Sequence, residues 1–151
     1  MKIEYQENSI RFTEGNYWFM YSFDDIFSGE REIDNNILPA EFDFNDEGGW
    51  GFEGYEYMDF EDLQNLQSSI QSVLDHRINI MDYEGGDCDE YIIHPIWRYR
   101  VKRKQDLYEI VLDKATEVGA VQLKGRVTEL DLIQWRDAVG DIVSRVEKLK
   151  I

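Results

Sequence analysis

Two stretches of this chain repeat their apolar residues every three or four positions, and each follows a longer stretch in which apolar and polar residues alternate. A repeat of about 3.6 residues belongs to an amphipathic helix, and a repeat of two belongs to a strand. The helical stretches cover residues 60–76, with Asp59 as the expected N-cap, and 129–149, where Thr128 and Asp131 resemble a capping box. The order strand-rich, helix, strand-rich, helix predicts an α+β fold.

The alternating stretches predict short antiparallel strands that end at Gly, Asn and Pro. In the first half we expect a hairpin over residues 3–12 and strands over 17–23, 37–44 and 50–57. Pro39 predicts either that the 37–44 strand lies at a sheet edge or that Pro39 lies at the start of the strand. In the second half we expect strands over 91–102, 107–114 and 120–127, with a turn near Gln105 and an acidic loop over 82–90.

No linker or internal repeat divides the 151 residues, which predicts a single domain, 1–151. We expect mainly antiparallel β-sheet with two main helices. One arrangement of these elements is two strand-plus-helix halves that share one sheet.

Negative charge is concentrated in the first 90 residues. They contain 23 Asp and Glu against 4 Lys and Arg, a net charge of −19, whereas the last 61 contain 9 against 12, a net charge of +3. The two parts sum to −16 for the whole chain. Such a field opposes direct binding of nucleic acid or an anionic membrane, and it favours a basic protein as the partner.

The most acidic region runs from residue 24 to residue 62, where Arg31 is the only basic residue. One interpretation is that its aromatic residues face a core and its acids face water. The other is that the acids form a surface for a basic protein, with aromatic residues as anchors. On the second interpretation we expect the partner to contact nine residues, namely Asp24, Asp25, Glu41, Asp43, Asp46, Glu47, Trp50, Glu53 and Glu56.

Basic residues alternate along one predicted strand, at Arg98, Arg100, Lys102 and Lys104. On a strand these four side chains share one face. They either balance the acidic half of the protein and protect an edge strand, or form a second contact with a partner.

No catalytic, metal or cofactor site is predicted, and we expect the protein not to be an enzyme. Residues 43–48 match the start of an EF-hand calcium loop, but the twelfth position, which requires a bidentate Glu, is Gly54. Cys88 lies among acids that disfavour a thiolate. His76 is explained by helix capping and His94 by packing.

The chain shows no signal peptide, no apolar run long enough to span a membrane, and one cysteine. These features predict a cytoplasmic protein. The sequence leaves the oligomeric state open.

In size, acidity and lack of a catalytic motif, the chain resembles bacterial toxin-immunity proteins, including those of contact-dependent growth inhibition systems. The resemblance is one of composition over the whole chain, and it implies neutralisation of a basic toxin domain, most readily a nuclease. Two alternatives stay open. A DNA mimic of the antirestriction type would bind many DNA-binding proteins, and a carbohydrate-binding module would use Trp18, Trp50 and Tyr55 as stacking platforms.

Overall fold

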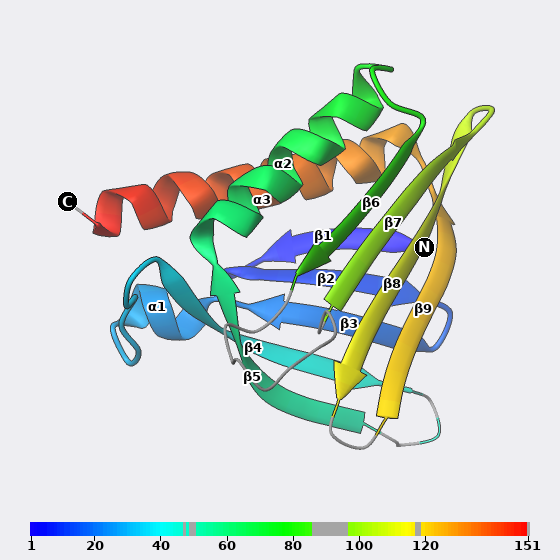
Figure 1. The fold of residues 1–151 in the computed structure, drawn as a ribbon. Coiled ribbons are helices and arrows are strands. Elements are labelled where there is room, and N and C mark those ends of the chain that lie inside the picture. The colour runs from blue at the N-terminus through cyan, green and yellow to red at the C-terminus, as the bar shows by residue number, and fades with distance from the viewer. Residues whose placement is uncertain (47, 49–50, 86–96, 117–118, 151) are drawn as a thin grey trace.

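A computed structural model describes residues 1–46, 48, 51–85, 97–116 and 119–150. Two antiparallel sheets face each other across a shared core, and two long helices lie across one side of the pair (Figure 1). The α+β class predicted from the sequence is confirmed. The two halves do not share one sheet, however, because each half forms a sheet of its own.

The N-terminal sheet, sheet A, has five strands in chain order. They are β1 (Lys2–Gln6), β2 (Ser9–Glu14), β3 (Tyr17–Ser22), β4 (Ile37–Asn45) and β5 (Gly51–Asp59). The β1–β2 turn places Glu7 and Asn8 at positive φ, which asparagine adopts readily. The predicted hairpin over 3–12 and the later strands of this half are therefore confirmed within one or two residues.

Pro39 lies near the start of β4, but β4 is an inner strand between β3 and β5. The prediction of an edge strand is therefore wrong, and the prediction of a strand start is right. β3 pairs with β4 only from Glu41 onward, so at Pro39 the strand has β5 alone as its neighbour. The missing N–H of the proline is tolerated there.

The C-terminal sheet, sheet B, has four strands in chain order. They are β6 (Ile80–Gly85), β7 (Trp97–Lys104), β8 (Leu107–Thr116) and β9 (Gly119–Val127). The turn predicted near Gln105 joins β7 to β8, and Gln105 has positive φ. The predicted acidic loop over 82–90 is wrong for residues 82–85, which belong to β6. The rest of that loop, which includes Cys88, lies outside the described residues. So do residues 91–96, which include His94.

Both predicted helices are present, as α2 (Phe60–Leu74) and α3 (Glu129–Leu149). The Asp59 side chain accepts a hydrogen bond from the Glu61 amide at 2.9 Å, and Thr128 with Asp131 forms the predicted capping box. His76 has positive φ just beyond the C-cap of α2, in agreement with its predicted place at the helix end. A short helix, α1 (Asp24–Ser28), was not predicted.

The core lies where the two sheets and α3 meet. Trp135 of α3 is 1% exposed and makes edge-to-face contacts with Phe12 of β2 and Tyr99 of β7, each at 5.2 Å between ring centres. Tyr99 also contacts Tyr21 of β3. Trp135 therefore joins the two sheets and α3. The outer face of each sheet is left available to solvent. None of the helices within the described residues combines the length and apolar character needed to cross a membrane.

Candidate functional site

Sheet A sorts the residues of the acidic region onto two faces. Along β4, alternate residues from Leu38 to Phe44 are buried in the core. The residues between them, including Glu41 and Asp43, point outward. The interpretation that the aromatic residues of this region face the core therefore holds for Phe42 and Phe44. Neither residue supplies an anchor for a partner.

The strand register gathers the outward carboxylates. Asp43 lies directly opposite Glu53 of β5, and Glu41 lies two residues before Asp43 on the same strand face. The row continues across the sheet through Met20 and Arg11 to Glu4 of β1. We call the outer surface of sheet A, together with the α1 residues beside it, the acidic face; its carboxylates are Glu4, Asp24, Asp25, Glu41, Asp43 and Glu53.

Asp43 is the half-buried centre of this face. Burial raises the pKa of its carboxyl above the ordinary value, and the charges of Glu53 and Glu41 raise it further, while Arg11 opposes them. Within the described part of the chain, no lysine or arginine comes within 4.0 Å of these three carboxylates. Like charges opposite one another destabilise a sheet, so this arrangement costs the isolated protein free energy.

Two arginines of the chain already lie on aromatic rings of the acidic face. The guanidinium of Arg11 is 4.6 Å from the centre of the Trp18 ring. Arg31 lies 3.6 Å from the centre of the Tyr55 ring and forms an ion pair with Asp25 at 3.6 Å. The charge of Asp25 raises the pKa of the Tyr55 hydroxyl, which Arg31 opposes. Of the two arginines, Arg31 thus contacts both an aromatic ring and a carboxylate.

Two of the hollows on this part of the molecule are lined by at least two acidic residues each. One, of about 260 Å³, is formed by β1, β2, β3 and the start of α1, and three carboxylates line it, those of Glu4, Glu7 and Asp24. The other, of about 210 Å³, lies beside Tyr57 and has Glu32 and Asp34 at its rim. Arg11 already lines the first hollow, whereas the second combines its carboxylates with the apolar surface of Ile37 and Pro39, as a lysine or arginine side chain requires.

The structure brings together five of the nine predicted contact residues. Glu41, Asp43 and Glu53 are neighbours, Asp25 reaches them through Tyr55, and Asp24 lines the first hollow. Asp46 is half-buried, just beyond the end of β4. Glu47 and Trp50 lie outside the described residues, and only the backbone of Glu56, in β5, is described.

Sequence reasoning missed several residues of the face, above all Glu4 on β1, Arg11 on β2 and Tyr57 on β5. Each lies on the polar side of a correctly predicted strand, so the alternation gave their orientation. What was lacking was the order of the strands, which places Glu4 and Glu53 in one row although they are far apart in the sequence.

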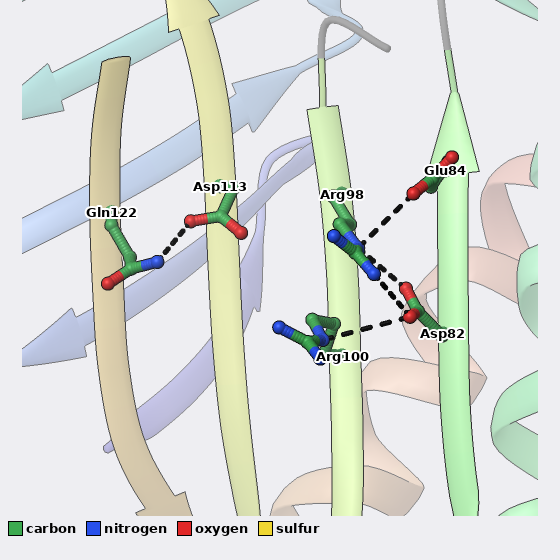
Figure 2. Close-up of polar contacts among 6 residues, drawn as sticks. All are labelled: Asp82, Glu84, Arg98, Arg100, Asp113 and Gln122. Atoms are coloured by element: carbon green, nitrogen blue, oxygen red, sulfur yellow. Dashed lines mark hydrogen bonds and ion pairs between the residues drawn. The ribbon is translucent and has the colours of Figure 1, made fainter.

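The basic row of β7 lies on the outer face of the other sheet, away from the acidic face. Arg98 makes two short contacts with Asp82 of β6, at 2.7 and 2.5 Å, and a longer one with Glu84 at 3.3 Å (Figure 2). Arg100 adds a contact with Asp82 at 3.7 Å. The hydrogen bond from Arg98 lowers the pKa of Asp82. The counter-charges of this row thus come from its own sheet, and residues 24–62 supply none of them among the described contacts.

Among the residues that the structure describes, no group of three or more His, Cys, Asp or Glu is arranged to hold a metal ion. Comparison of the chain with protein-family models, with curated proteins and with solved structures gave no match.

Proposed function

We propose that this protein is a cytoplasmic inhibitor that uses the acidic face to bind and neutralise a basic protein domain, such as a toxin nuclease. The observation that carries the proposal is the facing pair Asp43 and Glu53 with Glu41 beside them, without an ion-pair partner in the described chain. This cluster destabilises the free protein, and a cationic surface would relieve the repulsion. A nuclease has such a surface where it holds nucleic acid.

The separation of the two charged regions supports this function. Residues of the basic row pair locally with Asp82, Glu84 and Glu109, so they leave the charge of the acidic face largely uncompensated. The remaining field extends into solvent, where it accelerates encounter with a basic partner and selects against acidic ones.

The two alternatives receive less support from the same face. Arginines cover one side of the Trp18 and Tyr55 rings, which a sugar would need as stacking platforms. A DNA mimic needs carboxylates at the regular spacing of phosphates, whereas here Arg11, Met20 and Tyr55 interrupt them.

The test is capture of the partner from the source cells with the purified protein, followed by affinity measurements on the isolated pair. We expect one dominant basic protein whose enzymatic activity is inhibited on binding, with affinity that falls as NaCl rises. The double variant Asp43→Asn with Glu53→Gln should bind at least roughly tenfold more weakly.

A matched control removes two exposed charges elsewhere, in Asp106→Asn with Glu129→Gln. This control has the same net charge as the first double variant and should bind like the wild type. Equal affinity of all three proteins would overturn the assignment of the acidic face. Capture of many unrelated DNA-binding proteins would favour the DNA mimic instead.

A further inference from the structure

The hollow beside Tyr57 is an unfilled binding position on the acidic face. Tyr57 is 45% exposed, and with Ile37 and Pro39 it supplies the apolar part of the lining. Glu32 and Asp34, both exposed, supply the carboxylates. Among the described residues, no cation or second aromatic ring contacts Tyr57, and neither carboxylate has an ion-pair partner.

Tyr55, the neighbouring residue on the same face of β5, already has an arginine on its ring. Tyr55 and Tyr57 are two residues apart on β5, so both point outward. Tyr55, which is 50% exposed, carries the guanidinium of Arg31 on its ring, and Asp25 forms an ion pair with that guanidinium. The Tyr57 hollow repeats the ring and the carboxylates but lacks the arginine.

We propose that the Tyr57 hollow receives an arginine side chain of the basic partner; this inference rests on the function proposed above. The aliphatic part of the side chain would lie against Ile37 and Pro39, and the guanidinium would stack on Tyr57 within reach of Glu32 and Asp34. Arginine is favoured over lysine because its planar, weakly hydrated guanidinium stacks on an aromatic ring and pairs with a carboxylate at the same time.

The first test needs no partner and uses N-acetyl-arginine amide as the probe, with N-acetyl-citrulline amide as its neutral equivalent of the same shape. We expect saturable NMR shifts of the Tyr57 ring and of Ile37 with the arginine probe, at millimolar concentrations. The citrulline probe should give none. The double variant Glu32→Gln with Asp34→Asn should lose the response while its urea unfolding curve stays that of a folded protein.

Equal shifts with both probes, or shifts confined to other parts of the surface, would overturn the inference. So would no shift at all. Shifts at the hollow that grow with protein concentration in the absence of probe would mean that a second copy of the chain fills it, and would overturn the inference as well.

The second test uses the captured basic protein and compares Tyr57→Leu with Tyr17→Leu. Tyr17 is similarly exposed, at 49%, but lies at the far end of β3. We expect Tyr57→Leu to weaken binding roughly tenfold and Tyr17→Leu to leave it unchanged. An Arg→Lys substitution in the partner at the contacting position should remove the difference between wild type and Tyr57→Leu.

The two proposals fail in different ways. If the partner depends on Asp43 and Glu53 but not on Tyr57, the hollow is not an arginine site and the proposed function stands. If no basic partner is captured, the proposed function fails, and the small probes still decide what the hollow binds.

Discussion

At the scale of single residues, Asp43 carries an electrostatic cost that the fold does not need. Its carboxylate faces Glu53 across the β4–β5 pair, and its pKa is raised by burial and by both neighbouring acids. A residue retained for stability alone would be neutral or basic at this position. On the function proposed above, this repulsion is a cost to folding that is relieved on binding of a basic partner.

We predict that Asp43→Asn stabilises the isolated protein by roughly 0.5 kcal/mol at neutral pH, because it removes a like-charge pair across two strands. The folded-state pKa of Asp43 is raised, so its cost is present above that pKa and is relieved as pH falls through it. Urea unfolding at several pH values should show a gain for the variant that shrinks toward acid pH. A variant less stable than wild type at neutral pH would contradict this prediction.

Lys114 is a second residue whose environment opposes its charge. It lies on β8, is 4% exposed, and its ammonium is 5.4 Å from the centre of the Phe42 ring on the opposite sheet. Burial lowers the pKa of Lys114 to about 8, from 10.5 in the unfolded chain. Between these two values the unfolded state binds more protons than the folded state, so stability rises with pH.

From that difference we predict a gain of up to about 2 kcal/mol in the free energy of unfolding from pH 8 to 9.5, below the pH at which the buried tyrosines ionise in the unfolded chain. Urea unfolding of the wild type at pH 7.5, 8.5 and 9.5 should show the increase, and Lys114→Met should show a flatter profile. The same slope in both proteins would mean that another group titrates.

At the scale of elements, the N-terminus of α3 depends on a reciprocal pair of side-chain contacts. The hydroxyl of Thr128 accepts a hydrogen bond from the Asp131 amide at 3.2 Å, and the Asp131 carboxylate accepts one from the Thr128 amide at 2.9 Å. Because α3 carries Trp135 into the core, loss of the cap should reduce global stability and not only fray the helix.

We predict that Thr128→Ala lowers the free energy of unfolding by about 1 kcal/mol, since it leaves the Asp131 amide without a side-chain partner. Thr128→Ser keeps the hydroxyl and serves as the control, with a loss well below that of the alanine variant. Chemical denaturation of the three proteins measures both effects. Equal losses in the two variants would show that the methyl group, and not the cap, is responsible.

The elements that sequence reasoning found are those in which local pattern and tertiary packing agree. α3 was predictable because its apolar spacing and its cap lie in consecutive residues. α1 was missed because it has five residues and its N-cap, Phe23, makes no side-chain capping bond. β6 was missed because Asp82, Glu84 and Gly85 favour a loop, and only pairing with β7 makes them a strand.

The candidate site was predictable only in part, for a related reason. The charge of residues 24–62 indicated where to look, and five of the nine predicted residues lie on one face. Which face they share depends on strand order, and the Arg31–Tyr55 contact depends on how the chain folds back after α1. Neither is encoded in local periodicity.

At the scale of the whole molecule, a net charge of −16 on 151 residues sets the response to salt. The acidic face lies apart from the basic row, so repulsion within it is not balanced by the rest of the protein. Salt shortens the Debye length from about 30 Å at 0.01 M to about 3 Å at 1 M and so screens repulsion between exposed carboxylates.

We predict that the unliganded protein becomes more stable as NaCl rises, by on the order of 1 kcal/mol or roughly 3 °C in Tm. A chloride salt limits the separate effect of strongly excluded anions on apolar burial. Thermal unfolding at a series of NaCl concentrations measures the change. A decrease would mean that attractive pairs such as Arg98–Asp82 outweigh the repulsion.

On the function proposed above, Arg31 also affects the binding of basic proteins other than the partner. An arginine from any protein could reach Tyr55 only by displacing Arg31, and that exchange replaces one cation with another at almost no net gain. The rings that carry Arg11 and Arg31 are in this sense occupied by internal competitors. On the function proposed above, these two arginines therefore weaken the binding of other basic proteins to the acidic face.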